Sequence, residues 1–252
     1  MQLSIAIITY NEERNIERCL KSVQGIADEI IVVDSFSTDK TEEICSRYNV
    51  TFVKHAFEGY TEQKNYVASL CKNPLILSLD ADEALSAILK QSILNSKEKT
   101  DADGYTFNRA THFCGQHIKH CGWYPDATIR MWKAGKGKWI GEKVHEKFTL
   151  TEGSIIQHIS GDLLHYSYYS IEEHIAQVNK YSTLSAQKKF KKGKKSSLFA
   201  ITIFPKWRFF RDFIIKLGFL DGYYGFVICT NSAHEVFLKY AKLRDLWKQQ
   251  KA

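Results

Sequence analysis

The 252-residue chain lacks any run of about 18 apolar residues, the length that a membrane-spanning helix needs. Its first apolar stretch, Leu3 to Ile8, has no basic lead-in and runs directly into residues 11–14, Asn-Glu-Glu-Arg, so it predicts a strand rather than a signal peptide. No internal repeat is visible. The six cysteines are scattered along the chain, which indicates reduced thiols in the cytoplasm.

The sequence also lacks the two common glycine-rich phosphate cradles. No G-x-G-x-x-G follows the first apolar stretch, and no G-x-x-x-x-G-K-[ST] occurs anywhere. A nucleotide bound here would need a metal ion and side chains to neutralise its diphosphate. Residues 112–121 contain three histidines and two cysteines, but their spacing fits no standard zinc finger.

Charge is distributed unevenly between the two ends of the chain. From Ala186 onward, 15 Lys and Arg stand against 4 Asp and Glu, although the net charge of the whole chain is only +7. The first 185 residues are therefore slightly acidic. This asymmetry predicts different partners for the two ends.

Strand-like and helix-like segments alternate over the first 80 residues. Short runs rich in Ile and Val predict buried strands, and apolar residues at helical spacing predict helices between them. The predicted strands are 3–9, 29–34, 51–54 and 75–80. The predicted helices are 12–24, with Asn11 as its N-cap, a second ending at Tyr48, and 62–71. The alternation predicts an α/β fold with a doubly wound, mostly parallel sheet and helices on both faces.

Polar residues follow three of these predicted strands. They are residues 9–12, Asp34, and residues 80–82, and ligands bind beyond the carboxyl ends of strands in such sheets. The third group, Asp80, Asp82 and Glu83, places three acidic side chains within four residues. Such a cluster is tolerated when a divalent cation holds it. The alternative is a solvated turn that opens the next helix.

Three of these segments carry a family resemblance. Residues 4–12, 33–41 and 79–83 occur in the order and spacing of family-2 glycosyltransferases of the GT-A fold. A later stretch, which runs from Gly122 to Glu146, is similar to lipopolysaccharide core glycosyltransferases, often described as β-1,4-glucosyltransferases. The resemblance covers roughly residues 1 to 195. Phe36 departs from it, because relatives commonly have glycine there, and this change is expected to affect only the turn.

The resemblance implies which residues bind the nucleotide-sugar donor. They are Thr9, Asn11, Glu12, Asp34, Gln63, Lys64, Asn65, Asp80 and Arg130. Within this set, Asp34 is expected to contact the base, Asp80 the ribose, and Arg130 a phosphate. The alternative for residues 11–12 is helix capping, and for residues 63–65 it is an exposed helix face.

The resemblance further implies a metal site and a catalytic base. Asp82 is the expected direct ligand of Mn²⁺ or Mg²⁺, with His165 as a second protein ligand; the alternative for His165 is a histidine packed in the core. Glu146, in the segment Val-His-Glu, is the expected general base, which takes the proton of the acceptor hydroxyl. Asp126 is the alternative base, or it orients the donor sugar.

The aromatic residues near these motifs have two interpretations. Trp123, Tyr124 and Trp139 are candidates for stacking on sugar faces, or they belong to the core. Residues 112–121 are expected to form a loop on the acceptor side, as in the relatives.

The basic tail predicts a membrane-surface element. Residues 188–195 are rich in lysine, and residues 204–216 interleave basic residues with Trp207, Phe209, Phe210 and Phe213 on an expected helix. This composition is typical of helices that lie on anionic lipid. The alternative is a solvated face over core aromatics. A nucleic-acid partner is not expected, because no RNA- or DNA-binding motif is present.

The sequence therefore predicts a metal-dependent, inverting glycosyltransferase with a catalytic domain at 1–185 and a helical basic extension at 186–252. It is expected to move a sugar, glucose in particular, from a UDP-sugar to a lipid-linked glycan such as lipopolysaccharide core. Its expected location is the cytoplasm, peripheral on the inner face of the cytoplasmic membrane. Two alternatives are a catalytically inactive sugar-nucleotide or glycan-binding protein and a nucleotidyltransferase. The latter would need a Gly- and Lys-rich loop where residues 11–14 stand.

Overall fold

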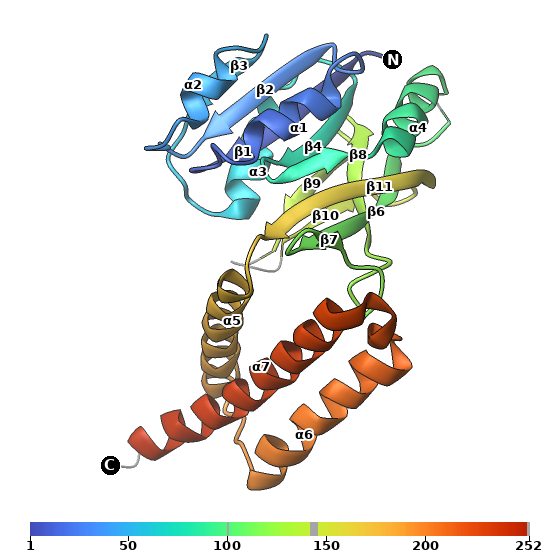
Figure 1. The fold of residues 1–252 in the computed structure, drawn as a ribbon. Coiled ribbons are helices and arrows are strands. Elements are labelled where there is room, and N and C mark those ends of the chain that lie inside the picture. The colour runs from blue at the N-terminus through green and yellow to red at the C-terminus, as the bar shows by residue number, and fades with distance from the viewer. Residues whose placement is uncertain (100, 142–145, 251–252) are drawn as a thin grey trace. The chain divides into compact units, whose positions relative to one another are not determined.

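The structure, a computed structural model, describes residues 1–99, 101–141 and 146–250. Its chain divides into two compact units (Figure 1). The first, here called the sheet unit, consists of Met1–Ala110 and Asp126–Tyr166, and the second, the helical unit, consists of Thr111–Pro125 and Ser167–Ala252.

The elements follow one another as the alternation in the sequence predicts. The strands are β1 (Leu3–Thr9), β2 (Glu29–Asp34), β3 (Thr51–Lys54), β4 (Leu75–Asp80), β5 (Glu83–Leu85), β6 (Gly104–Phe113), β7 (Gln116–His117), β8 (Ala127–Lys133), β9 (Gly137–Ile140), β10 (Lys147–Leu150) and β11 (Ile156–Tyr168). The α-helices are α1 (Ile16–Val23), α2 (Thr41–Cys45), α3 (Tyr60–Leu70), α4 (Ala87–Glu98), α5 (Ile171–Lys191), α6 (Leu198–Phe210) and α7 (Gly222–Gln249). A π-helical turn η1 (Arg211–Ile215) and a 3₁₀ turn η2 (Gly218–Asp221) connect the last two helices.

The larger sheet is mixed, with a parallel half and an antiparallel half. Its strand order is β3-β2-β1-β4-β8-β6-β11-β5. Strands β3, β2, β1 and β4 are parallel, whereas β8 pairs antiparallel with β4. In this register Thr9 of β1 lies beside Asp34 of β2, and Ile8 lies beside Asp80 of β4. The predicted convergence of three polar strand ends at one edge of the sheet is therefore confirmed.

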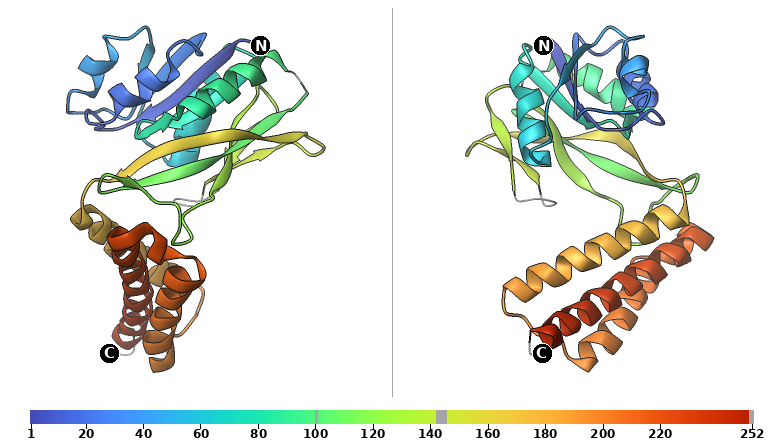
Figure 2. Two further views of the ribbon diagram at one scale, coloured as in Figure 1. Left: turned by 45° about the vertical axis from the view of Figure 1, so that its right-hand side comes forward. Right: turned by 90° about the vertical axis from the view of Figure 1, so that its left-hand side faces the viewer.

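Helices cover both faces of the parallel strands, and this confirms the doubly wound fold (Figure 2). Because successive side chains of a strand point to opposite faces, β1 contributes to two cores. Its residues Leu3, Ile5 and Ile7 pack with α1, and Ala6 and Ile8 pack with α3 and the β9–β10 hairpin. Strand β1 is buried along its whole length, as its continuous apolar sequence predicts.

Two details at the end of β1 differ from the sequence analysis. Helix α1 begins at Ile16 rather than residue 12, so Asn11 is not its N-cap. Instead Asn11 has a positive φ of 53°, and its side-chain oxygen accepts a hydrogen bond from the Thr38 backbone at 2.8 Å. Asparagine tolerates this left-handed conformation better than most residues, which explains its place in the turn. Phe36 also has a positive φ, of 62°, a conformation that glycine adopts without strain.

The helical unit contains α5, α6, η1, η2 and α7, in agreement with the predicted helical C-terminal region. The predicted boundary between residues 185 and 186 falls inside α5, a continuous helix of 21 residues, and the compact units divide after Tyr166 instead. Among the described residues, no single helix is long and apolar enough to cross a membrane. Residues 198–215 and 218–249 pass that test of length and composition together, with a bend of 72° between them.

Residues 111–125 belong to the helical unit because Asp221 holds them there. The Asp221 carboxylate accepts hydrogen bonds from the backbone N–H groups of Lys119 and His120, at 3.2 and 2.8 Å, and its Oδ1 lies 3.0 Å from Nδ1 of His120. Asp221 itself is buried. A segment one hundred residues earlier in the chain thus packs with α7, a contact that no local pattern in the sequence indicates.

His174 gives the helical unit a predicted pH dependence. The ring is buried among Phe113, Trp123 and Tyr168, and the Asn231 side chain donates to its Nδ1 at 3.1 Å. Burial lowers the pKa of His174 to about 4. The unfolded chain binds the proton near pH 6.5, so the free energy of unfolding should fall by about 3 kcal/mol as the pH drops from about 6.5 to about 4.

Urea unfolding of the wild type and of His174→Gln at several pH values measures this effect. The variant cannot titrate at this position, so it should lose that part of the pH dependence. Parallel pH profiles for the two proteins would contradict the prediction.

Candidate active site

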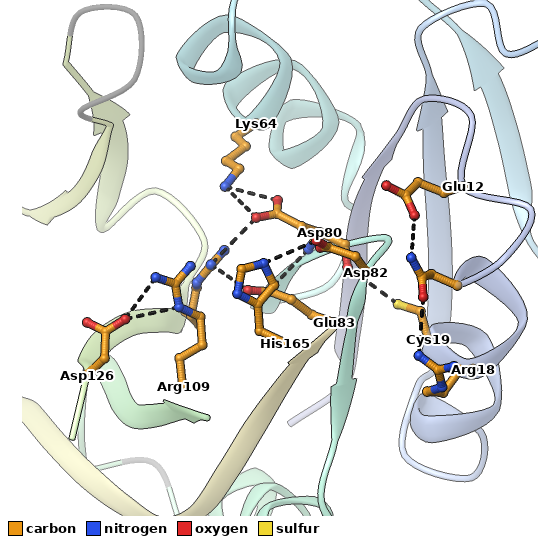
Figure 3. A network of polar contacts seen from close by, with 12 residues as sticks. Glu12, Arg18, Cys19, Lys64, Asp80, Asp82, Glu83, Arg109, Asp126 and His165 are labelled. Carbon is orange, nitrogen blue, oxygen red and sulfur yellow. Dashed lines mark hydrogen bonds and ion pairs between the residues drawn. The ribbon is translucent and has the colours of Figure 1, made fainter. Parts of the chain in front are cut away.

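Asp80, the last residue of β4, is surrounded by two buried cations (Figure 3). The ammonium group of Lys64 lies 3.0 Å from the Asp80 carboxylate, and the guanidinium of Arg130 lies 3.6 Å from it. Lys64 is 3% exposed and Arg130 is 4% exposed. Burial alone would raise the pKa of Asp80, but the charges of Lys64 and Arg130 outweigh it and hold that pKa well below its usual range. Asp80 is therefore an oriented anion at the edge of the sheet.

Glu83 shares Arg130 with Asp80. Its Oε1 lies 2.8 Å from Arg130, and its Oε2 accepts the backbone N–H of Asp80 at 2.9 Å. Burial raises the pKa of Glu83, while Arg130 opposes that rise. The predicted contact of Arg130 with a donor phosphate would require this ion pair to open. Arg130 is buried, so it is not a surface arginine.

Asp82 meets His165 because β5 pairs with the last strand of the sheet unit. In this antiparallel pair His165 of β11 lies opposite Glu83, and the Tyr166 backbone N–H donates to the Asp82 carbonyl at 2.9 Å. His165 Nε2 and Asp82 Oδ2 are then 3.1 Å apart. Burial alone would lower the pKa of His165, but Asp82 raises it more. Two side chains 83 residues apart in sequence, both predicted as metal ligands, are neighbours.

Asp82 and His165 suit a divalent cation that is shared with a ligand. A carboxylate oxygen and an imidazole nitrogen are an appropriate pair for Mn²⁺, and Mg²⁺ is usually held by one or two carboxylates together with substrate phosphates. In the part of the chain that the structure describes, no three His, Cys, Asp or Glu side chains form a ready metal site. The remaining ligands would come from a diphosphate and water. A bound cation would also replace the proton that holds this pair together.

The structure corrects the argument that repulsion in the acidic cluster requires a divalent cation. Lys64 and Arg130 pair with Asp80, Arg130 also pairs with Glu83, and His165 pairs with Asp82. Lys64 and Arg130 therefore compensate the charges of Asp80 and Glu83, and Asp82 has a polar partner in His165. The case for a metal depends on the partly exposed position of Asp82 beside His165, and not on uncompensated charge.

Glu12 lies at the same edge of the sheet, after the end of β1. Its Oε2 accepts a hydrogen bond from the Asn15 side chain at 2.7 Å, and its backbone N–H donates to Thr41 Oγ1 at 2.9 Å. Burial, together with the negative charges of Asp82 and Asp39, raises the pKa of Glu12 to about 7. A bound cation or a ligand hydroxyl would favour the ionised form. Thr9, directly before this turn, is buried at the end of β1.

Asp34 holds the turn after β2. It is fully buried and accepts hydrogen bonds from the backbone N–H and the hydroxyl of Ser37. Ser37 in turn accepts the Asn11 backbone N–H at 2.8 Å. The carboxylate thus fixes the shape of the turn, and its predicted contact with the base stays a prediction.

The Gln-Lys-Asn element of α3 points inward, so the exposed-face alternative is wrong. The Gln63 amide donates to Ser35 Oγ at 3.0 Å and lies 2.9 Å from Nδ1 of His55. Asn65 forms two hydrogen bonds with the backbone of Trp139, at 2.9 and 3.0 Å, which fix β9 against α3. These groups position the walls of the site, and their contact with a nucleotide stays a prediction.

The two candidate bases have different surroundings. Asp126 pairs with Arg109, whose Nε and terminal nitrogen lie 3.0 and 2.9 Å from its Oδ2. Glu146 lies directly before β10 and is partly exposed. The preceding residues of its motif, Val144 and His145, lie outside the described residues. Asp126 is thus engaged by a cation in a way that suits a positioning role.

The aromatic residues near the motifs are mostly structural. Trp139 is buried against Trp132 and Phe148 in the second core. Trp123 packs against Phe113 and Tyr168 in the helical unit. For these two tryptophans the core alternative agrees with the structure better than sugar stacking does.

Sequence reasoning missed Arg109 and Arg18. Arg109 anchors Asp126 from β6, and Arg18 of α1 stacks on the ring of Tyr166, 3.7 Å from its centroid. Neither arginine stands in a motif. Strand β6 also contains threonine, asparagine and histidine, so no pattern in the sequence singled out Arg109.

The chain is similar to known proteins over most of its length. Residues 4–149 match the sequence profile of Glycosyl transferase family 2. An uncharacterized glycosyltransferase of Rickettsia bellii is 35% identical over 97% of this chain and 87% of that protein. The lipopolysaccharide core biosynthesis glycosyltransferase LpsC of Rhizobium meliloti is 29% identical over 96% of this chain and 92% of that protein.

A solved structure shows the same fold. The mannosyltransferase PcManGT from Pyrobaculum calidifontis, in complex with GDP-Man and Mn²⁺, gives a TM-score of 0.56 at 12% identity and covers 98% of this chain and 88% of that one. The profile match and the similarity to the Rickettsia bellii protein show that the chain belongs to glycosyl transferase family 2, and its mixed sheet has the GT-A fold.

Proposed function

We propose that this protein is a metal-dependent, inverting glycosyltransferase that moves a hexose from a UDP-sugar to a lipid-linked glycan. The observation that carries the proposal is the pair of Asp82 and His165, 3.1 Å apart, next to the oriented Asp80 carboxylate. Without a glycine-rich cradle, a nucleotide-sugar transferase needs other groups to bind its donor. Here Asp80 would bind the ribose, and a cation held by Asp82 and His165 would bind the diphosphate.

The chemical step divides among the chain's own residues. Glu146 takes the proton of the acceptor hydroxyl as its oxygen attacks the anomeric carbon, and the bond from that carbon to the diphosphate breaks. Asp82 and His165 would hold the cation, which would supply electrostatic stabilisation of the departing diphosphate. Asp126, held by Arg109, orients the donor sugar. Asp80 accepts a hydrogen bond from the ribose.

The proposal also specifies the sugar, the acceptor and the location. The sugar is glucose, the acceptor is lipopolysaccharide core, and the enzyme works at the inner face of the cytoplasmic membrane. The similarity to LpsC, a lipopolysaccharide core glycosyltransferase, supports the acceptor class. The 15 Lys and Arg after residue 185 support a location on an anionic membrane surface. Because such glycans carry a lipid anchor, an enzyme that works on them gains from being held at the same surface.

Release of nucleoside diphosphate from a panel of donors tests the proposal. UDP-glucose, UDP-galactose, UDP-N-acetylglucosamine and GDP-mannose should be compared with Mn²⁺, with Mg²⁺ and with EDTA. We expect the UDP-sugars to be turned over, UDP-glucose fastest, and EDTA to abolish the reaction. Full activity in EDTA would contradict the metal, and a preference for GDP-mannose would contradict the donor.

A further inference from the structure

Helix α6 is strongly apolar, yet it is hardly buried. Its sequence, LFAITIFPKWRFF, contains three polar residues, and Ala200 is the buried residue among its 13. A helix that is apolar on nearly all sides normally lies in a protein core or in a membrane. Within the helical unit, one side of α6 packs on α7, and its other side faces away from that unit (Figure 2).

The exposed residues form a stripe at helical spacing. Large apolar side chains that are exposed recur every three or four residues along α6 and η1: Phe199, Ile203, Trp207, Phe210 and Ile214. Phe209 and Phe213, which were predicted to lie in the membrane-surface element, are instead partly buried and pack against the core of the helical unit that contains Cys229. The packing therefore separates aromatic residues that interleave in the sequence.

The stripe continues into the corner between η1 and α7. Leu217, Phe219, Leu220 and Tyr223 are all exposed, Leu220 at 57% and Tyr223 at 67%. Leu217 also has a positive φ of 53°, a conformation that is uncommon for leucine and more comfortable for asparagine or glycine. An exposed leucine therefore occupies a backbone conformation that asparagine or glycine would adopt with less strain.

The charges in the stretch of sequence that carries this surface are mostly positive. Between His174 and His234 the sequence contains 11 Lys and Arg and two carboxylates, Asp212 and Asp221. Both carboxylates are buried, and Asp212 pairs with Arg208 and Arg211. This whole stretch is described by the structure, and it exposes cations and apolar groups without an exposed carboxylate.

We propose that the stripe and the corner together, called the insertion surface, enter the acyl region of an anionic bilayer while the flanking lysines contact its headgroups. Large exposed apolar patches mark interaction sites, and basic residues beside them favour anionic lipid. A second copy of the chain is a poorer occupant, because pairing two such surfaces would bring like charges together. Residues 198–215 and 218–249 together pass the test for a membrane span, and the 72° bend between them agrees with re-entrant insertion. This inference adds the membrane-contacting residues to the proposed function and rests on it only for its biological purpose.

Vesicle flotation with the full chain tests the insertion surface. Vesicles of phosphatidylcholine alone should bind the protein weakly, and vesicles that also contain phosphatidylglycerol should bind it strongly at low salt. High salt should weaken this binding without abolishing it, because salt screens charge but does not affect apolar burial. If wild-type protein fails to float with anionic vesicles, or if high salt removes all binding, insertion is wrong.

Single substitutions separate insertion from folding. Leu217→Asn should weaken vesicle binding by about tenfold or more, since a buried leucine side chain is lost from the acyl region. It should keep or raise the melting temperature in water, because asparagine accepts the positive φ. The matched control is Ile155→Asn, an exposed isoleucine of the sheet unit, which should bind vesicles like the wild type. Equal binding by all three proteins would overturn the proposal.

Tryptophan fluorescence locates the contact. Trp207 is the exposed one among the chain's five tryptophans, all of which the structure describes. Vesicles with brominated acyl chains should quench the wild-type emission, and Trp207→Phe should lose most of that quenching. Unchanged quenching in the variant would place the contact elsewhere. A dimer by light scattering that Leu217→Asn converts to a monomer would instead assign the surface to self-association.

Measuring donor turnover separately from vesicle binding distinguishes a failure of the insertion proposal from a failure of the proposed function. Leu217→Asn should hydrolyse a soluble nucleotide sugar at the wild-type rate, because no donor-site residue changes. Loss of vesicle binding with normal turnover supports insertion. Absence of turnover in the wild type would overturn the proposed function and leave the vesicle result standing.

Discussion

Replacing Asp82 with alanine should lower kcat/KM for the nucleotide-sugar donor by at least about 10²-fold and remove its dependence on Mn²⁺. Asp82 is the carboxylate nearest to His165, so the variant leaves a single imidazole as protein ligand. A cation held mainly by phosphates and one histidine is bound weakly and is poorly oriented. The diphosphate leaving group then loses stabilisation in the transition state.

Calorimetric titration of UDP with and without Mn²⁺ measures this effect directly. The wild type should bind UDP more tightly with Mn²⁺, and Asp82→Ala should show the same weak binding in both conditions. Asp101→Ala, which removes an exposed carboxylate of the same unit, is the control and should behave like the wild type. If Asp82→Ala keeps Mn²⁺-dependent UDP binding, then Asp82 is not the metal ligand.

Glu146→Gln should lower kcat by about 10² to 10⁴-fold while leaving the Kd for UDP unchanged. Glutamine has nearly the same shape as glutamate but cannot take a proton from the acceptor hydroxyl. Glu146 lies before β10 and is partly exposed, as a group that must meet a second substrate should be. Asp126 instead has its Oδ2 engaged by two nitrogens of Arg109.

The comparison of Glu146→Gln with Asp126→Asn decides between the two carboxylates. If Asp126 positions the donor, Asp126→Asn should raise KM or the donor Kd more than it lowers kcat. Glu152→Gln, an exposed glutamate at the other end of β10, is the matched control for an effect of charge alone. The assignment would be reversed by near-normal turnover in Glu146→Gln together with loss of kcat in Asp126→Asn.

The sequence by itself determined the parallel half of the sheet and the edge at which the site lies. Strands β1, β2 and β4 are mostly apolar and buried, and the helices between them return the chain to the same end of the sheet, so the strands pair in parallel. Once they pair, Thr9, Asp34 and Asp80 must end at the same edge. The motifs at these strand ends likewise indicated the family before any contact was known.

Only the tertiary structure decided how the charges and aromatic residues of these motifs are used. Lys64, Arg130 and His165 come from α3, β8 and β11, and their pairing with Asp80, Asp82 and Glu83 follows from strand order and register, which no local spacing fixes. The same holds for residues 111–125, which join the helical unit because Asp221 accepts their backbone N–H groups from one hundred residues away. On α6 and η1, helical periodicity marks faces but does not say which face is covered. Packing against α7 partly buries Phe209 and Phe213 and leaves Trp207 and Phe210 exposed, because a helix side is covered only when another element lies against it.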